Sequence, residues 1–251
     1  MDTIAYIDQL ANADSIEALW AMHTDRMSRY GFDRLIYGFT RYRTTTSLGD
    51  PDDFILLTNQ PKAYTDGFIG QGLYFHAPMV RWALENDGAC SWRILDGMIG
   101  QGALSAEEQK VIAFNHAHKV TAGYSISFRA LSSRSKGAIA LTAREGLSQD
   151  DVEEIWAAHG RDITAMNNVA HLKILALPYT SASRVLTPRQ REALEWVGDG
   201  KTTQDIAMLM GLTPATVEKH LRLARASLNV ETTAQAVLKA ALQNQMFILE
   251  A

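Results

Sequence analysis

The chain has 251 residues, a hydrophobic content of 47% and a formal net charge of −4. This length allows two domains, and this hydrophobic content excludes a disordered chain. Because there is one cysteine, no internal disulfide can form. We find neither a leader peptide nor an apolar run of ~18 residues, and we therefore expect a soluble cytoplasmic protein.

The first 176 residues combine helical and extended patterns. Ser15 can cap a helix with apolar residues at helical spacing, and Ser105 with Glu108 forms a capping box. The predicted elements are, in chain order, helices within 3–31, strands at 35–42 and 54–57, one or two helices within 61–88, a strand at 91–95, a helix at 105–119, strands at 123–131 and 138–142, and a long helix at 148–175. This order predicts an α+β fold for residues 1–176, an α/β/α sandwich in which helices cover an antiparallel sheet. The alternation within 123–131 indicates a half-buried strand.

A different pattern follows a short linker, predicted at 177–185. Residues 186–251 are predicted to form a separate all-α domain of four helices with a helix-turn-helix arrangement. Thr202 and Asp205 open the second helix as a capping pair, and Gly211 supplies the turn into the third, where a positive φ can be needed. The buried side of the second helix is predicted to consist of Ile206, Ala207, Leu209 and Met210.

The third helix presents two contrasting faces. Its core stripe is predicted to consist of Val217, Leu221, Ala224 and Leu228. On the opposite face, Lys219 and Arg222 can reach phosphates or guanine edges. A lone basic pair usually belongs to a solvated surface, but this pair lies on the second helix of a capped helix-glycine-helix unit, which favours DNA binding. The candidate DNA-contacting residues are Thr213, Thr216, Glu218, Lys219, His220 and Arg222.

The charge of this domain is almost balanced. Residues 184–251 contain eight Lys and Arg against seven Asp and Glu, a net charge of +1. DNA affinity must then come from a few well-placed basic groups, and pairing of two copies would raise it. The last helix favours pairing, because its apolar residues exceed what one small core needs: Ala236, Val237, Ala240 and Ala241. We therefore expect a homodimer that binds an inverted-repeat operator in double-stranded DNA.

Three sequence stretches carry a family resemblance. They are Leu-Thr-Pro-Arg-Gln-Arg-Glu-Ala-Leu at 186–194, Gly-Lys-Thr-Thr-Gln-Asp-Ile-Ala at 200–207 and Thr-Val-Glu-Lys-His-Leu-Arg at 216–222. Together they resemble the LuxR-type DNA-binding domain, over roughly the last quarter of the chain. The resemblance implies that the third helix enters the major groove. Gln190 stands where the family usually has Glu, and Glu218 suggests a contact to cytosine N4 or an altered site preference.

The first domain is similar to the autoinducer-binding domain of the same LuxR family, which is a GAF/PAS-like fold. Relatives hold an acyl-homoserine lactone between the sheet and a helical layer. In them a Trp and a Tyr donate to the ligand's carbonyls, an Asp followed by Pro accepts from its amide N–H, and a second Trp forms a wall. Pro78 and Trp92 match this pattern, as does Gly123, which corresponds to a Gly at the start of the fifth strand.

Three positions depart from the family pattern. Tyr64 replaces the first Trp and can still donate through its hydroxyl. Phe68 replaces the Tyr and cannot donate, and Ala77 replaces the Asp and cannot accept. A buried amide left unpaired costs about 1–3 kcal/mol, roughly tenfold to a hundredfold in affinity. His76 is a candidate substitute acceptor, although a shift of one residue on a helix turns a side chain by about 100°.

The candidate ligand-binding residues are therefore Tyr64, Phe68, His76, Ala77 and Trp92. Three alternatives stay open: an acyl-homoserine lactone, a different small apolar signal molecule, or a pocket filled by the protein's own side chains. For Trp92 alone, a core role and a ligand contact are equally supported.

The sequence offers no catalytic residues, and we expect neither an enzyme nor a cofactor. His116 and His118 are two positions apart on a helix and point to different faces, so no metal site is expected. Cys90 has no neighbouring base, and no phosphate loop or nucleophile elbow occurs.

The sequence thus predicts a DNA-binding transcriptional regulator of the quorum-sensing LuxR type. Its first domain would sense a small apolar signal and control DNA binding by the second. The alternative is a ligand-independent dimeric regulator, in which the first domain serves as a dimerisation or protein-interaction module.

Overall fold

The computed structural model describes residues 2–45, 47–130, 132–179 and 184–247. The chain divides into two compact units, Met1–Ile174 and Leu175–Ala251. We refer to them as the N-terminal and C-terminal units.

A five-stranded antiparallel sheet forms the centre of the N-terminal unit. Its strands are β1 (Phe32–Thr40), β2 (Ile55–Thr58), β3 (Gly88–Ser91), β4 (Gly123–Phe128) and β5 (Lys136–Ala143). Their order is β2-β1-β5-β4-β3 and every neighbouring pair is antiparallel. The central strand, β5, pairs with β1 from about 100 residues earlier in the chain, with Leu35 opposite Leu141.

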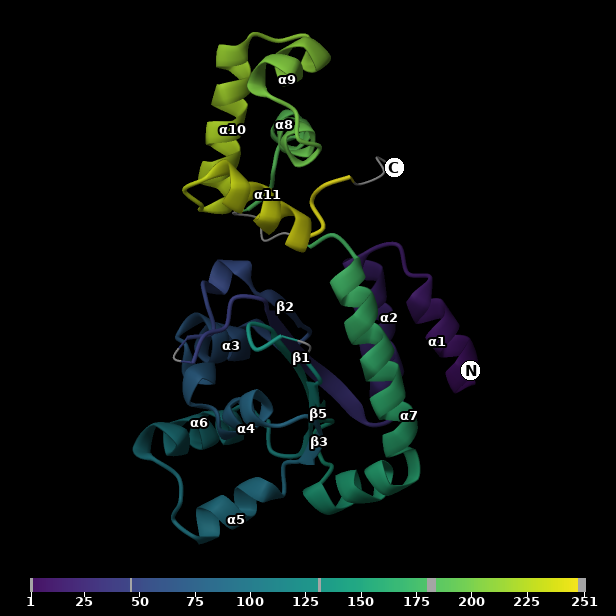
Figure 1. Cartoon of the computed structure of the whole chain (residues 1–251). Helices are drawn as coiled ribbons and strands as arrows, with labels where there is room; N and C mark the ends of the chain where they lie inside the picture. Colours follow the sequence, from purple (N-terminus) through teal and green to yellow (C-terminus); the bar gives the residue numbers. More distant parts are fainter. Residues whose placement is uncertain (1, 46, 131, 180–183, 248–251) are drawn as a thin grey trace. The chain divides into compact units, whose positions relative to one another are not determined.

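Helices cover both faces of this sheet (Figure 1). On one side lie α1 (Thr3–Ala11), α2 (Ile16–Ser28) and α7 (Gln149–Ala176). On the other lie α3 (Lys62–Thr65), α4 (Pro78–Glu85), α5 (Ile94–Gly100) and α6 (Ala106–Ala117). The predicted α/β/α sandwich with an antiparallel sheet is therefore confirmed.

The helix starts follow from local capping. Ser15 caps α2 by accepting from the backbone N–H of Ala18 at 3.2 Å. At the start of α6, Ser105 and Glu108 form a complete capping box, which satisfies two backbone N–H groups that lack helical partners.

Two details of the predicted strands were wrong. The strand expected at 91–95 ends at Ser91, and Ile94 already begins α5. β4 is buried along its whole length instead of on one face, because both of its sides are covered by helices. Its polar residues Ser125 and Ser127 tolerate burial because each has a hydrogen-bond partner.

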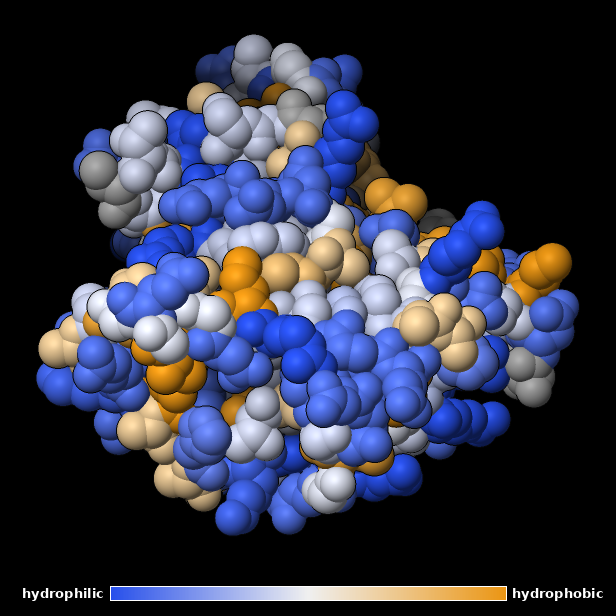
Figure 2. All heavy atoms as spheres, turned by 90° about the horizontal axis from the view of Figure 1, so that it is seen from below, coloured by the Kyte–Doolittle hydropathy of each residue, from blue (hydrophilic) through white to orange (hydrophobic). Residues whose placement is uncertain are grey.

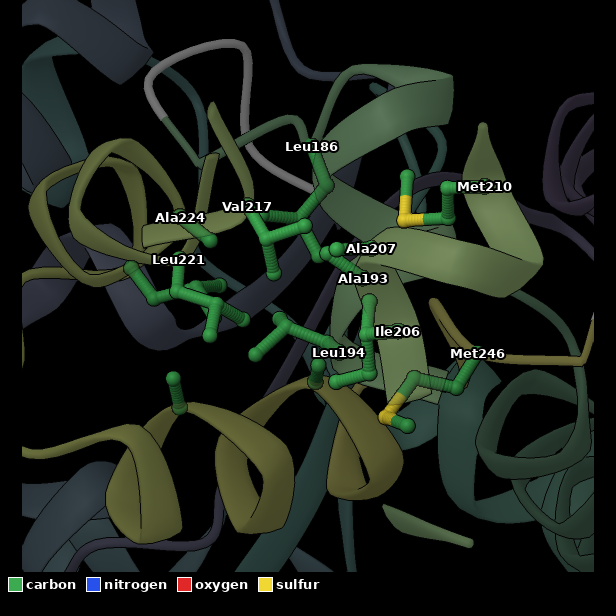
Figure 3. Close-up of a cluster of buried hydrophobic side chains, with 13 residues drawn as sticks. Leu186, Ala193, Leu194, Ile206, Ala207, Met210, Val217, Leu221, Ala224 and Met246 are labelled. Carbon is green, nitrogen blue, oxygen red and sulfur yellow. The ribbon is translucent and has the colours of Figure 1, made fainter. Parts of the chain in front are cut away.

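The C-terminal unit is a four-helix arrangement of α8 (Pro188–Gly198), α9 (Thr203–Met210), α10 (Pro214–Leu228) and α11 (Thr233–Leu242). Complete capping boxes open α8, α9 and α11, and Gln190 supplies the one at α8. The predicted core stripe of α10 is buried, and Figure 3 shows side chains of this core pointing toward one another. Leu209 is a correction, since it is 52% exposed. The eight residues of α9 bury only the side formed by Ile206, Ala207 and Met210.

The face of the molecule in Figure 2 is mostly hydrophilic, and its hydrophobic side chains lie in small, separate groups. None of the helices in the described ranges is long and apolar enough to cross a membrane.

Candidate ligand cavity and nucleic-acid interface

The N-terminal unit contains a cavity of about 810 Å³ that is lined by residues of the sheet and of α3 to α6. This volume lies within the range of about 300–1,000 Å³ that is typical of small-molecule sites. Alternate strand residues point to one face of a sheet. The residues of this face that line the cavity are Ile36, Gly38, Thr40, Leu56, Ser125, Lys136, Ala138, Ala140 and Thr142.

Small residues at the centre of this face keep the cavity open. Gly38 is paired with Leu56 on one side and with Ala138 on the other. A Cβ atom added at Gly38 would meet no atom within 4 Å. These small strand residues form the floor of the cavity. They were not predicted from the sequence, although a glycine inside an aromatic strand often indicates a site where a ligand approaches the backbone closely.

Four of the five predicted ligand-binding residues come together in the cavity wall: Tyr64, Phe68, Ala77 and Trp92. All four are buried, with exposed fractions between 2% and 9%. His76 is exposed and does not line the cavity. It is the last residue of the short 3-10 helix Leu73–His76, one position before the buried Ala77. His76, the predicted substitute acceptor, therefore lies outside the cavity wall in this structure.

The Tyr64 hydroxyl is engaged within the protein. It donates to Asn115 Oδ1 on α6 at 2.9 Å, and its ring stacks on Phe68 with 5.2 Å between centroids. Burial raises the pKa of Tyr64 well above its usual value, so the hydroxyl stays protonated. Tyr64 thus ties the helical layer together beside the cavity.

Trp92 makes a hydrogen bond within the protein and also lines the cavity. Its indole N–H donates to Ser125 Oγ on β4 at 2.9 Å. Gly123 is required beside it, because an added Cβ would lie 3.1 Å from the Trp92 ring and would clash with the Leu141 carbonyl. The strand that Gly123 begins is the fourth in this chain. Both interpretations of Trp92, core and ligand wall, are thus compatible with its position.

The C-terminal unit presents the candidate DNA-contacting face of α10. Gly211 ends α9 with φ of 65°, and Thr213 caps α10 by accepting from the Thr216 backbone N–H. The 15 residues of α10 span about 22 Å at 1.5 Å per residue, and the major groove, about 12 Å wide, admits such a helix.

The candidate DNA-contacting residues differ in their exposure and in their hydrogen-bond partners. Lys219 and Arg222 are exposed, and neither has a hydrogen bond or ion pair to another described residue. Glu218 is exposed but accepts a 3.0 Å bond from Thr203 of α9. Thr213 is exposed, whereas Thr216 and His220 are partly buried. The two cations are therefore free to meet phosphates or base edges, while Glu218 also joins the two helices of the motif.

Two further observations concern possible metal ligands and the single cysteine. Within the described ranges, no group of three or more His, Cys, Asp and Glu side chains could hold a metal ion. Burial, followed by the charge of Glu153, raises the pKa of the Cys90 thiol, which disfavours the thiolate.

Each of the two units matches a known protein family. Residues 15–174 match the family described as autoinducer binding domain, and residues 184–240 match that of bacterial regulatory proteins, luxR family. The transcriptional activator protein AnoR of Acinetobacter nosocomialis is 24% identical over 85% of this chain and 85% of its own.

Two solved structures share the fold. A structure of SdiA in complex with octanoyl-rac-glycerol superimposes with a TM-score of 0.55 at 16% identity, over 96% of this chain and 93% of SdiA. CepR2 of Burkholderia cenocepacia, described as an N-acylhomoserine lactone dependent transcription factor, gives a TM-score of 0.53 at 15% identity, over 69% and 94%.

Proposed function

Because the chain belongs to the LuxR family of quorum-sensing transcriptional regulators, we propose that it is a signal-dependent regulator. A small apolar molecule would bind in the N-terminal unit and control DNA binding by α10. The observation that carries this proposal is the cavity above Gly38, which the chain's own side chains leave open.

Open apolar volume favours a ligand over an orphan regulator. A cavity forfeits van der Waals contacts along its walls, which makes the empty unit less stable. A ligand that fills it restores these contacts and stabilises the folded unit by mass action. SdiA and CepR2 support an acyl ligand, since one was solved with an acylglycerol and the other is described as dependent on an acylated lactone.

Thermal shift of the whole chain tests this proposal directly. We expect acylated lactones or esters, with acyl chains of four to twelve carbons, to raise the melting temperature of the N-terminal unit. A series in which no chain length shifts the melting temperature would favour the ligand-independent alternative.

The Ala77→Asp variant is expected to bind acyl-homoserine lactones at least several-fold more tightly than the wild type. Ala77 lines the cavity and is 5% exposed, so a carboxylate there would accept the ligand's amide N–H in a charge-assisted bond. The same variant should melt at a lower temperature without ligand, because its carboxylate is then buried unpaired. Titration calorimetry measures the first effect and a ligand-free melt the second. Unimproved lactone binding would show that position 77 is not the missing acceptor.

The Arg222→Ala variant is expected to lose specific DNA binding while its fold persists. A good base contact from arginine contributes roughly 1–3 kcal/mol of discrimination, and Arg222 has no hydrogen bond or ion pair to another described residue that the substitution would remove. Gel-shift titration against the natural operator, with a melting curve, measures both properties. Arg189→Ala is the matched control, because that arginine lies on α8 and pairs with Glu192 at 2.8 Å. Equal losses in the two variants would remove Arg222 from the readout role.

We propose that the homodimer forms through α11, but through other residues of this helix than those expected from the sequence. Ala236 and Ala240 are fully buried in the unit's own core, so they are unavailable to a partner. The exposed apolar side of α11 is formed instead by Leu238, at 62%, and Leu242, at 36%, together with Ala241. We propose that two copies meet along this side and along the N-terminal unit, which would space two α10 helices on adjacent major grooves, about 34 Å apart.

The Leu238→Glu variant is expected to weaken this dimer at least tenfold, because it places a charge in an apolar contact. Light scattering over a concentration series measures the effect. Leu209→Glu is the control, since Leu209 is similarly exposed but lies on α9. A wild type that stays monomeric with and without DNA would contradict the proposal.

A further inference from the structure

We propose that α5 is the lid of this cavity. A ligand enters and leaves where α5 lifts away, and α5 then closes on it through Leu95 and Ile99. The proposal rests on the ligand-sensing function proposed above, and it adds the route of the ligand and two residues that contact it.

α5 is only weakly held in place by the rest of the N-terminal unit. None of its seven residues is buried, and its side chains form no hydrogen bond or ion pair with another described residue. Leu95 packs against the cluster that contains Trp92, but it is itself only partly buried. Helices shorter than about 12 residues depend on tertiary packing for their stability. A helix that buries so little therefore opens far more readily than the rest of the unit.

Two glycines lower the stability of α5 further. Gly97 lies inside the helix and Gly100 ends it, and a Cβ atom added at either would meet no atom of a described residue within 4 Å. Neither has a positive φ, so alanine would fit at both positions. A glycine inside a helix makes the helix roughly three- to fivefold less stable than alanine does. Neither packing nor a turn requires these glycines, and their effect is to ease the opening of α5.

The chain on both sides of α5 is well anchored. Trp92, two residues before the helix, is 8% exposed and donates to Ser125 at 2.9 Å. Leu104, four residues after the helix, is also 8% exposed and leads into the capping box of α6. Residues 94–103 can therefore move as one segment while the cavity wall and α6 keep their places, as lids of binding sites do.

The cavity reaches the surface of the protein beside α5. Leu95 and Ile99 both line the cavity, and because they are four residues apart they lie on the same side of the helix. Ile99 is 50% exposed although it belongs to the cavity lining. A ligand in the cavity would cover this side chain, and burial of its apolar surface favours the closed position of α5.

Hydrogen exchange of the full-length, ligand-free protein tests whether α5 opens. We expect the hydrogen-bonded amides of α5 to exchange at least tenfold faster than those in the middle of α6, which also lines the cavity but buries Val111. Equal protection of the two helices would overturn the lid, whether or not a ligand is known.

The double variant Gly97→Ala with Gly100→Ala tests the route of the ligand. The probes are octanoyl-rac-glycerol, with which SdiA was solved, and N-octanoyl homoserine lactone. We expect association and dissociation both to slow about tenfold, because both pass through the open state, while Kd stays within about twofold. Stopped-flow tryptophan fluorescence measures the rates, since Trp92 lines the cavity.

The control for the double variant makes the same substitution in the other unit. Gly198 ends α8, and a Cβ atom added there would lie 3.4 Å from the terminal methyl group of Met246, an ordinary contact. Gly198→Ala should leave both rates unchanged. If the wild type binds a probe and the double variant binds and releases it at wild-type rates, the lid is overturned while ligand sensing stands.

Two isoleucine variants test the contact between the lid and the ligand. Ile99→Ser is expected to weaken binding of the probes at least fivefold in titration calorimetry, because it removes apolar surface that the ligand covers. Ile94→Ser is the matched control, since Ile94 is 37% exposed on the same helix but does not line the cavity. Equal effects of the two variants would overturn the contact. If no acylated lactone or ester of four to twelve carbons binds the wild type, ligand sensing fails, and the lid fails with it.

Discussion

Val217→Asp is expected to unfold the C-terminal unit at room temperature. Val217 is fully buried among the core residues of this unit (Figure 3). A lone buried carboxylate costs several kcal/mol, whereas a folded unit of 77 residues (175–251) has a total stability of roughly 4–12 kcal/mol. The loss is therefore comparable with the whole free energy of unfolding, and calorimetry of the full chain should lose the transition of this unit.

The control for Val217→Asp adds the same charge two residues earlier. Ala215 is exposed in the first turn of α10, where a negative charge interacts favourably with the helix dipole. Ala215→Asp should leave the melting temperature within a few degrees of the wild type. Similar melting of the two variants would mean that the α10 stripe is not the core of this unit.

Gly38→Leu is expected to abolish ligand binding while raising the stability of the ligand-free protein. Open space stands above Gly38, and a leucine there would occupy the floor on which a ligand must lie. Full burial of a leucine side chain contributes about 1.5–3 kcal/mol, and a strand favours leucine over glycine. We expect a higher melting temperature, and at least a hundredfold loss of affinity for any ligand that shifts the wild type.

A smaller side chain provides the graded control for this variant. Gly38→Ala adds one carbon that meets nothing within 4 Å, so most ligand affinity should remain. Undiminished binding by Gly38→Leu would place the ligand elsewhere than on the sheet.

The C-terminal unit could be predicted almost completely from its sequence, because its signals are local. Each helix opens with a threonine whose partner lies three residues later, and such pairs are visible without any knowledge of tertiary structure. Two assignments were wrong: Leu209 is exposed, and Ala236 and Ala240 of α11 are buried in the unit's own core. In a helix as short as α9, periodicity cannot tell which of two adjacent apolar residues faces inward.

The wall of the cavity could be predicted from the sequence but its floor could not, because the floor depends on contacts between distant parts of the chain. Tyr64, Phe68, Ala77 and Trp92 were found by the resemblance of one stretch of sequence to the pattern of the autoinducer-binding family. The floor depends on Gly38 lying opposite Ala138, a register between strands about 100 residues apart that no local pattern encodes. The exposure of His76 likewise follows from tertiary packing, because Leu73 and Tyr74 of the same turn pack, partly buried, against the cluster that contains Tyr64, whereas His76 is exposed.

The pairing of β1 with β5 sets the order in which this protein can assemble during synthesis. At about 5–20 residues per second, roughly 5–20 s pass between the emergence of Leu35 and that of its partner Leu141. Throughout this interval one edge of an aromatic, apolar strand has no partner in the nascent chain. Strong overexpression should therefore yield aggregates of the N-terminal unit, and slower translation at low temperature should increase the soluble fraction.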